Sequence, residues 1–278
     1  MDWLTALFLI AFGVFTSTLG TLIGVGGGFI VVPVFLFLFP HLTPTDVTSI
    51  SLAAIFLGSI SGLVAYARLR RIDYRTGVAF AVGTIPGAVV GANLVKLVPR
   101  EPFQVLFGSV LALVGIYLVF RPTFRPRPSP LGPNRTLTDR TGQTFAYRVT
   151  VWKGTLLSLG VGVLSSLLGV GGGVFQVPAM VAWLGVPALI AAPTSLFILV
   201  FTSASATLTH AVAGDLNAIW PYALLLALGM IGGAQVAGRL ARRIASQALV
   251  RLLGLVLGGA GIYLLLVGLG VLGGGRGR

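Results

Sequence analysis

Gly24-Val25-Gly26-Gly27-Gly28 and Gly169-Val170-Gly171-Gly172-Gly173 are two nearly identical stretches of this 278-residue chain. A proline follows each stretch, Pro33 in the first and Pro178 in the second, and both lie in apolar sequence. The chain therefore repeats itself, with one glycine-rich break in each copy. Membrane transporters built from two structural repeats need such breaks, because their substrate sites form where helices are interrupted near the bilayer midplane.

The composition indicates a membrane protein. Hydrophobic residues make up 56% of the chain and charged residues only 9%, with a mean hydropathy of +0.99. A chain of this composition cannot bury all its apolar surface against itself in water. The N-terminus opens Met1-Asp2-Trp3 without the basic region of a cleavable signal peptide, so the first hydrophobic segment is expected to be retained.

The formal net charge of +13 does not indicate a nucleic-acid-binding protein. The Lys and Arg residues fall in short clusters between hydrophobic runs, which is a topology signal, and not on one soluble face interleaved with aromatic residues. The chain has no cysteine, and His41 and His210 lie in unrelated contexts. We therefore predict no nucleic-acid partner, no metal site and no cofactor.

The apolar segments number five in each half of the chain, and most approach the roughly 20 residues that span a bilayer. Between the halves, residues 121–150 are rich in Arg, Pro, Thr and Gly and lack an apolar period, which predicts a linker between repeats at 1–120 and 151–278. The two shortest segments hold the glycines, and each is expected to be a broken or re-entrant element. The segments are 3–22, 24–40, 47–67, 76–98, 103–120, 151–168, 170–186, 188–212, 218–238 and 248–271.

The repeat extends beyond the glycines. Thr48-Ser49 matches Thr194-Ser195, the stretch 83–88 matches 229–234, and Gly115-Ile116-Tyr117 matches Gly261-Ile262-Tyr263. An odd number of crossings in each half makes the second copy enter the membrane upside down. The predicted fold is an all-α polytopic membrane protein with two inverted repeats of about five hydrophobic segments each.

The charges of the loops support this inversion. The loop at 68–75 is strongly basic whereas its counterpart around Asp215 has no base, and the loop at 239–251 is more basic than its counterpart at 96–101. The positive-inside rule then places both basic loops and the linker in the cytoplasm, and both ends of the chain outside.

The glycines allow two interpretations. For the sets at 83–91 and 229–233, the four-residue spacing favours close packing of helices. Three consecutive glycines cost a helix about 1 kcal/mol each relative to alanine, so Gly26–Gly28 and Gly171–Gly173 are expected to open the helix. An opened helix exposes backbone N–H groups, which attract an anion together with the local dipole. Neither run matches a dinucleotide-binding fingerprint.

Few polar residues lie inside the spans, and most are expected to be interhelical hydrogen-bonding groups. The two Thr-Ser pairs recur after a proline, Pro44 or Pro193, and are either site or helix-capping residues. Gln176 and Gln235 replace apolar counterparts and are expected to give the site asymmetry. His210 is a minor candidate. The candidate substrate-binding residues are Gly26, Gly27, Gly28, Thr48, Ser49, Gly171, Gly172, Gly173, Gln176, Thr194, Ser195 and Gln235.

All six carboxylates lie in loops or at the ends of spans, so none is placed to carry a coupling proton or sodium ion. An anion that leaves a cell with a negative interior moves downhill by about 2.3 kcal/mol per charge per 100 mV, so export needs no coupling ion. An intramembrane enzyme is the rival class, but the spans show no set of catalytic residues, and we predict no enzyme and no catalytic residue. A passive anion pore is the alternative, and saturable binding separates it from a transporter.

The two glycine-proline elements, the repeated halves and the basic linker resemble the sulfite exporter TauE/SafE family over about residues 10–120 and 152–268. The resemblance implies a multi-pass plasma-membrane protein that moves sulfite, sulfonates or related organosulfur anions, often outward. Its implied partners are a small anion and the lipid bilayer, and a homodimer is left open. It also implies that Gly26–Gly28 and Gly171–Gly173 line the midplane beside the Thr-Ser pairs. No arginine lies in the spans to bind a sulfonate bidentately, so the substrate stays open.

Overall fold

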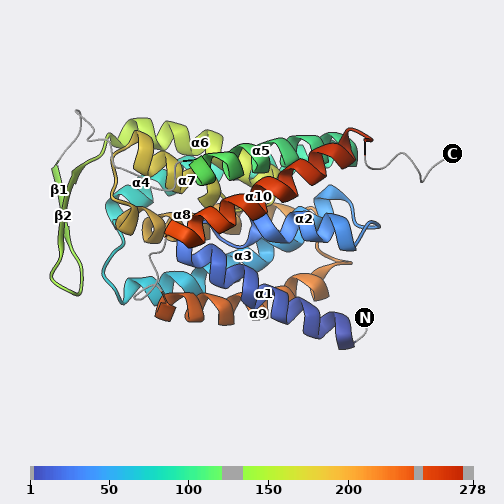
Figure 1. Cartoon of the computed structure of the whole chain (residues 1–278), viewed down its shortest axis with the longest axis horizontal. Coiled ribbons are helices and arrows are strands. Elements are labelled where there is room, and N and C mark those ends of the chain that lie inside the picture. Colours follow the sequence, from blue (N-terminus) through green and yellow to red (C-terminus); the bar gives the residue numbers. More distant parts are fainter. Residues whose placement is uncertain (1–2, 121–133, 241–246, 272–278) are drawn as a thin grey trace.

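The computed structural model describes residues 3–120, 134–240 and 247–271, and these residues form a helical bundle with one β-hairpin (Figure 1). In the first half the elements are α1 (Trp3–Ile23), α2 (Gly28–Leu38), α3 (Pro44–Ala67), α4 (Tyr74–Leu94) with the 3₁₀ turn η1 (Val95–Leu97), and α5 (Arg100–Phe120). The antiparallel hairpin of β1 (Asn134–Thr138) and β2 (Thr144–Arg148) follows. The second half contains α6 (Val151–Leu167), α7 (Gly173–Pro178) with the π-helical η2 (Ala179–Trp183), α8 (Ala188–Val212), α9 (Trp220–Leu240) and α10 (Gln247–Gly268).

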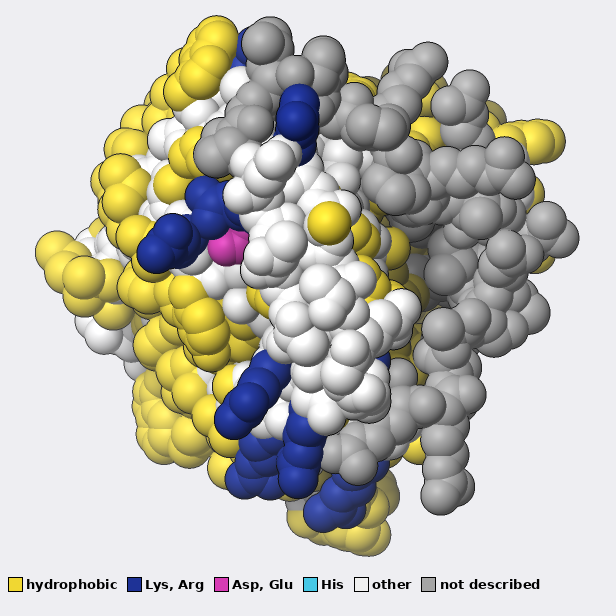
Figure 2. Space-filling model, turned by 90° about the vertical axis from the view of Figure 1, so that its left-hand side faces the viewer, with side chains coloured by type: hydrophobic (Ala, Val, Ile, Leu, Met, Phe, Trp, Pro, Cys, Tyr) yellow, Lys and Arg dark blue, Asp and Glu magenta, His cyan; other side chains and the backbone are white. Residues whose placement is uncertain are grey.

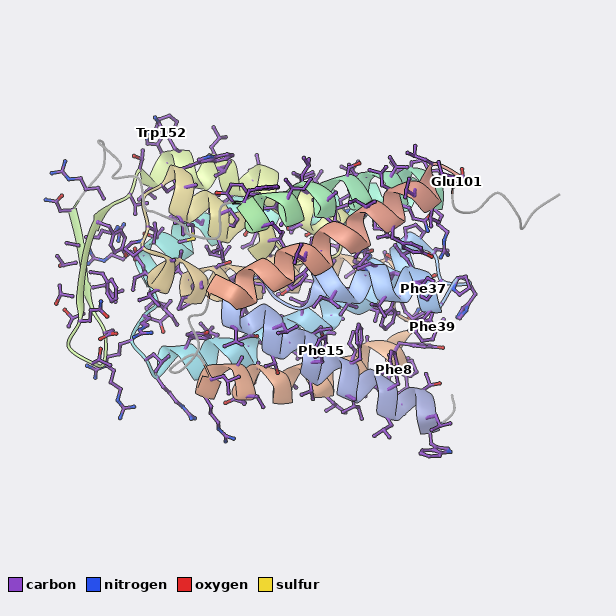
Figure 3. All side chains as sticks on the ribbon, viewed as in Figure 1. Phe8, Phe15, Phe37, Phe39, Glu101 and Trp152 are labelled. Atoms are coloured by element: carbon purple, nitrogen blue, oxygen red, sulfur yellow. The ribbon has the colours of Figure 1, made fainter. Side chains whose placement is uncertain are left out.

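The helices have the length and the apolar outer surface of membrane-spanning helices. Within the described ranges, five of them (α1, α3, α4 extended by η1, α8 and α9) are long and apolar enough to cross a membrane. Phe15, Phe37 and Trp152 are more than half exposed, and Figure 3 shows them on the outside of the bundle. Such a surface is unfavourable in water and is solvated by lipid.

The four tryptophans lie at the two ends of the bundle. Trp3 and Trp220 begin α1 and α9, Trp152 lies in the first turn of α6, and Trp183 ends η2. All four are more than half exposed. Tryptophan favours the membrane–water interface, so the two pairs mark two interfacial levels.

Helices of the first half pack on helices of the second half, and the pairs are equivalent when the two halves are interchanged. α4 packs on α6 as α9 packs on α1, while α3 packs on α8 and α5 on α10. Figure 1 shows α1 running from the N-terminal end of the bundle toward the hairpin, whereas α6 starts beside the hairpin and runs the opposite way.

The glycines predicted to pack do so at equivalent positions. A Cβ at Gly87 would collide with the carbonyl oxygen of Leu159 in α6, and a Cβ at Gly233 would collide with the carbonyl oxygen of Val14 in α1. One turn away, a Cβ at Gly83 would collide with the carbonyl oxygen of Thr155 in α6, and a Cβ at Gly229 with that of Ile10 in α1. These contacts confirm close helix packing at both glycine sets.

The two ends of the bundle differ in charge. We call the end that carries the hairpin the basic end; its described Lys and Arg residues are Arg68, Arg70, Arg71, Arg75, Arg135, Arg140, Arg148, Lys153 and Arg239. Figure 2 looks onto this end and shows the Lys and Arg side chains gathered there. At the opposite end, Lys96 and Arg100 are accompanied by Asp46, Glu101 and Asp215.

The hairpin lies within the stretch predicted as a linker, and the sequence patterns did not predict its strands. Its residues Leu137, Phe145 and Tyr147 pack on apolar side chains of α4, η2 and α8. The Tyr147 hydroxyl donates to Asp73 at 2.9 Å, and Arg71 forms an ion pair with Asp139 at 2.8 Å. The hairpin is therefore docked on the basic end. Residues 121–133 of the predicted linker lie outside the described ranges.

Candidate functional site

The first glycine-rich break ends α1 with a turn that other residues adopt poorly. Gly24 and Gly26 have φ values of 76° and 78°, in the left-handed region. The backbone N–H groups of Val25 and Gly26 both donate to the carbonyl of Gly20, at 2.8 and 3.2 Å. The chain then turns back, and α2 begins at Gly28.

The second break repeats this geometry. Gly169 and Gly171 have φ values of 70° and 77°, and Val170 N–H donates to the carbonyl of Ser165 at 2.9 Å. Gly172 adds a third left-handed residue, with φ 103°, before α7 begins at Gly173. The two glycine runs therefore interrupt the helices, as predicted.

The two breaks touch each other. A Cβ at Gly28 would lie 2.6 Å from the carbonyl oxygen of Gly169, and a Cβ at Gly173 would lie 2.5 Å from that of Gly24. Gly26 and Gly171 each face the same two side chains, Ile55 of α3 and Leu199 of α8. Two segments 145 residues apart in the repeat thus meet between the two central helices.

The starts of α2 and α7 bring unpaired donors to this meeting point. The hydrogen bonds of the described chain leave the backbone N–H groups of Gly27, Gly28 and Phe29 without an acceptor, and likewise those from Gly171 to Val174. The first N–H groups of a helix have no partner inside the helix and carry the positive end of its dipole. Two such ends close together create an environment that favours an anion.

A small cavity of about 10 Å³ lies beside the first break, which leaves room for about one water molecule. Gly26 and Gly27 form part of its wall, and three hydroxyl side chains, Ser17, Thr21 and Ser59, supply the polar groups. The remaining wall residues are Ile55, Gly58, Leu196, Leu199 and Met230. We call this space the inner cavity, because it lies on the side of Ile55 that leads along α3 to the basic end.

Tyr66 closes the inner cavity toward the basic end. It is buried, and its hydroxyl donates to the carbonyl of Thr21 at 3.3 Å. Thr21 itself packs on Gly62, one turn before Tyr66 on α3. Arg68 and the rest of the basic loop follow directly, so Tyr66 separates the cavity from the basic end.

The first Thr-Ser pair bonds within its own helix. The hydroxyls of Thr48 and Ser49 both donate to the carbonyl of Thr45. The cap of α3 is a different pair, Thr43 with Asp46, which exchange hydrogen bonds in a capping box. Ser51 reaches the break instead, donating to the carbonyl of Gly169 at 2.7 Å.

The second pair lies at positions that differ from those of the first. The Thr194 hydroxyl accepts a hydrogen bond from the backbone N–H of Asp73, and Ser195 is buried with its hydroxyl unpartnered. Gly169 packs on Thr48, whereas its counterpart Gly24 packs on Ala192. Thr48 is therefore equivalent in space to Ala192, and Ser51 to Ser195. This spatial register differs by two residues from the sequence match, which pairs Thr48 with Thr194.

The two predicted glutamines lie away from the inner cavity. The Gln176 amide donates to the Ser158 hydroxyl at 3.1 Å, and its carbonyl oxygen is buried without a partner. The Gln235 amide donates to the carbonyl and the hydroxyl of Ser61 and ties α9 to α3. Both therefore link helices in the described structure.

The sequence patterns missed Ser17 and Thr21, which line the inner cavity from α1. Their spacing of four residues, directly before the first break, places both hydroxyls on one helical face. This pair of hydroxyls on one helical face next to a glycine break is the sequence pattern that could have identified Ser17 and Thr21.

A larger groove of about 620 Å³ lies on the outside of the bundle between α5, α6 and the α7–η2 element. Its walls are formed by side chains such as Leu113, Leu164, Phe175 and Trp183. An apolar groove of this kind suits lipid chains and lacks the donors that an anion needs. We therefore place the candidate site at the glycine breaks.

Comparison with known proteins identifies the family of the chain. A family model for "Sulfite exporter TauE/SafE" matches residues 9–264. The chain belongs to the TauE/SafE sulfite exporter family. It is 32% identical over 256 residues to "Probable membrane transporter protein YunE" of Bacillus subtilis, covering 90% of this chain and 93% of the relative.

More distant TauE/SafE relatives cover similar shares. A "Probable membrane transporter protein" of Methanocaldococcus jannaschii is 24% identical over 270 residues, 93% of this chain and 94% of the relative. One from Xylella fastidiosa strain Temecula1 is 26% identical over 247 residues, 88% of each chain. No solved structure matches the chain significantly. The chain is a membrane transporter of the TauE/SafE type.

This TauE/SafE transporter keeps its described carboxylates at the two ends of the bundle. Asp215, in the loop before α9, forms an ion pair with Lys96 and a hydrogen bond with Nδ1 of His210, both at 2.8 Å. Burial by itself would raise the pKa of Asp215, but the hydrogen bonds from Lys96 and His210 outweigh it and hold the pKa below its usual value. Asp215 is thus an anion that links the ends of α4 and α8.

Proposed function

We propose that the protein transports a small anion, sulfite, a sulfonate or a related organosulfur anion, and that it binds the anion where the starts of α2 and α7 meet. The observation that carries this proposal is the pair of helix starts with unpaired backbone N–H groups between α3 and α8. Backbone donors suit an anion that must be released again, because their partial charges attract it less strongly than a full positive charge.

The inner cavity supports a transporter that closes around its cargo. Its volume of about 10 Å³ is too small for a sulfur oxyanion, so binding requires the breaks or the side chain of Met230 to move. Tyr66 covers the cavity on one side, and the Ile55 and Leu199 layer lies on the other. A passive anion channel is the alternative, and a continuous open pore is what it would require.

The proposed direction is export down the membrane potential. Among the described residues, Asp46, Asp73, Glu101, Asp139 and Asp215 all lie in first helical turns, cap positions, the hairpin or loops. No carboxylate of this set is placed to bind a coupling cation beside the breaks. The positive-inside rule assigns the basic end to the cytoplasm, so that the arginines there raise the local anion concentration at the entrance.

The localisation that follows is the plasma membrane, with the hairpin in the cytoplasm and the two repeats inverted about the membrane plane. The exchange of the α1–α9 and α4–α6 contacts and the opposite directions of α1 and α6 support this arrangement (Figure 1). A homodimer is compatible with this proposal and is not required by it.

The experiment is a ligand-induced thermal shift on purified protein with sulfite, thiosulfate, methanesulfonate, sulfate and acetate. We expect saturable stabilisation by at least one sulfur oxyanion and none by acetate. Stabilisation follows the logarithm of ligand concentration above the dissociation constant, so a titration gives the affinity. A flat response to every anion, together with transport that does not saturate, would favour the passive channel.

A further inference from the structure

The structural equivalence of the two repeats shows which residues of the second half correspond to those around the inner cavity. Gly26 and Gly171 both contact Ile55 and Leu199, so these two side chains are equivalent. Tyr66 follows Ile55 by 11 residues, and His210 follows Leu199 by the same 11. Both lie near the C-terminal end of their helix, at opposite ends of the bundle. His210 is thus the counterpart of Tyr66.

Thr21 has a counterpart in the same way. Thr21 precedes Gly26 by five residues, and Ser166 precedes Gly171 by five. The Tyr66 hydroxyl donates to the carbonyl of Thr21 at 3.3 Å. The equivalent pair in the second half is His210 with Ser166, on the far side of the breaks from the basic end.

No hydrogen bond joins His210 to Ser166, in contrast to Tyr66 and Thr21. The imidazole of His210 is shorter than the phenol of Tyr66, and its Nε2 is buried without a partner. The hydroxyl of Ser166 is also buried without a partner, and both residues have 0% of their surface exposed. Leaving buried polar groups unpaired is unfavourable, and such groups in a folded protein call for a water, an ion or a functional role to account for them.

The chemistry of the pair selects the ligand. His210 Nδ1 lies 2.8 Å from the Asp215 carboxylate, which only accepts, so Nδ1 donates its proton there. In the neutral ring Nε2 is then an acceptor, whereas the Ser166 hydroxyl can donate. Lys96 also binds Asp215 and keeps the carboxylate charged. A hydroxyl donor and an imidazole acceptor, placed together by the equivalence of the two halves, fit an oxyanion that carries one O–H group.

We propose that Ser166 and His210 form an exit-side subsite through which the transported anion passes after the breaks, and that it accepts a singly protonated oxyanion, with hydrogensulfite as the probe. This inference rests on the proposed function. The Ser166 hydroxyl donates to a charged oxygen of the anion, and Nε2 of His210 accepts from its O–H group. Asp215 is a positioning residue, because it fixes the tautomer of the ring.

Two histidine variants separate the ring nitrogens. The amide nitrogen of asparagine can take the place of Nδ1, so His210→Asn keeps the contact with Asp215 and loses Nε2. The amide of glutamine extends to the place of Nε2, so His210→Gln keeps a polar group there. Ser166→Ala removes the donor. Ser205→Ala, a serine on α8 that bonds to its own helix, is the matched control.

The experiment measures two quantities on each full-length variant: thermal stabilisation by sulfite, and sulfite efflux from proteoliposomes at mildly acidic pH. We expect Ser166→Ala and His210→Asn to lower efflux about tenfold, the order of effect of one lost hydrogen bond to a charged ligand, while stabilisation at the breaks stays within about twofold. His210→Gln and Ser205→Ala should keep most of the efflux.

Wild-type efflux by both Ser166→Ala and His210→Asn would overturn the subsite and leave the proposed function in place. If the two histidine variants lose efflux equally, Ser166→Ala decides: a loss supports the subsite, and normal efflux overturns it. A wild-type protein that neither responds to sulfur oxyanions nor transports them would overturn the proposed function itself, and the subsite with it. Melting curves without ligand show whether each variant is folded.

Discussion

The hydroxyl of Thr202 donates to the hydroxyl of Thr84 at 2.9 Å, linking α8 to α4 at the level of the glycine breaks. At the equivalent place in the other half, Gly58 of α3 faces Met230 of α9, and a Cβ at Gly58 would lie 2.9 Å from the Met230 Cβ. One half therefore pairs two hydroxyls where the other pairs a large side chain with a glycine. This difference leaves Met230, and not a threonine, against the inner cavity.

Exchanging these pairs tests whether the halves are equivalent in packing. Thr84→Met should overpack the α4–α8 contact and destabilise the protein by about 1–3 kcal/mol. Thr202→Gly alone should cost about 1 kcal/mol as a glycine inside a helix. The double variant should be more stable than the sum of the two predicts, because the glycine makes room for the methionine. Thermal unfolding in detergent measures the coupling, and simple additivity would contradict the equivalence.

Glycine spacing was the most reliable signal in the sequence. Gly83, Gly87, Gly229 and Gly233 lie against neighbouring backbone as predicted, because only glycine permits two helices to approach at four-residue intervals. The glycine runs break the helices for an equally local reason, which is the left-handed φ values of Gly24 and Gly26 in the first run and of Gly169, Gly171 and Gly172 in the second. Both properties depend on the backbone next to each glycine and can be predicted from the sequence alone.

The register of the central helices could not be predicted in this way. Residue identity and nearly constant spacing match Thr48-Ser49 with Thr194-Ser195, each after a proline. Pro44 begins α3, but Pro193 lies inside α8, which begins after Pro187. The spatial equivalence is therefore shifted by two residues. Only contacts between distant segments, such as Gly24 with Ala192, show it.

The hairpin was missed for a related reason. Its strands are five residues each and bury only one side against the bundle, so the alternation is short and surrounded by Arg and Thr. Its position is set by partners far away in the sequence, Arg71 for Asp139 and Asp73 for Tyr147. Local propensity carries no information about such contacts.

The docking of the hairpin can be tested through Asp139. Its carboxylate accepts from the Thr141 hydroxyl and backbone, from Arg71 and from the Gln143 backbone, and these bonds hold its pKa well below its usual value. A carboxyl with a lowered pKa contributes stability above its ordinary pKa and loses it only as pH falls through the lower folded value. Hydrogen exchange in 134–148 should therefore be equally protected at pH 7 and pH 5.

Asp139→Asn should weaken the docking, since it removes the charge that pairs with Arg71. Hydrogen exchange should rise in the hairpin and not in α3 or α8. Arg148→Ala is the control, because Arg148 bonds to Asn134 on the exposed side and should change protection by about 0.5 kcal/mol or less. Equal protection in Asp139→Asn and wild type would show that the apolar contacts of Leu137 and Phe145 and the Tyr147–Asp73 hydrogen bond hold the hairpin without Asp139.

The orientation of the bundle can be measured with single cysteines in this cysteine-free chain. Gln143 is exposed at the hairpin turn, and Ala218 is exposed in the loop at the opposite end. We expect Gln143→Cys to react with an impermeant reagent only after the membrane is opened, and Ala218→Cys to react in intact cells, because the basic end is assigned to the cytoplasm. The reverse labelling would invert the proposed topology, and labelling of both from outside would disprove it.

Transport should respond to membrane potential and not to an imposed proton or sodium gradient, since no described carboxylate lies beside the breaks. Each charge that crosses contributes about 2.3 kcal/mol per 100 mV. In proteoliposomes, a potassium and valinomycin diffusion potential should change the initial rate. Uptake driven by a pH step with the potential clamped at zero would contradict the prediction, once the leak of protonated substrate through protein-free liposomes is subtracted.

The breaks themselves are tested by leucine substitutions. Gly27 has an ordinary φ of −86°, and a Cβ there would lie 2.9 Å from the flexible end of Met230 and 3.2 Å from the Thr16 backbone. Gly27→Leu should therefore fold with Met230 displaced and its own side chain filling the inner cavity. Gly172 has room for a Cβ near Ser165, but its φ of 103° disfavours leucine, so Gly172→Leu should lose about 1–3 kcal/mol of stability. Both variants should lose stabilisation by sulfur oxyanions, because the backbone donors are displaced or covered.

Gly87→Ala is the control for these two variants. A Cβ there collides with the carbonyl of Leu159 in α6, far along the chain from either break, so the variant should melt at a lower temperature than wild type. Its response to the anion should nevertheless persist, since the starts of α2 and α7 are unchanged. If both leucine variants fold and bind with wild-type affinity, the glycine runs serve packing alone. The anion would then have to bind among the buried hydroxyls of α3 and α8, beginning with Ser51 and Ser195, which lie at equivalent positions next to the breaks.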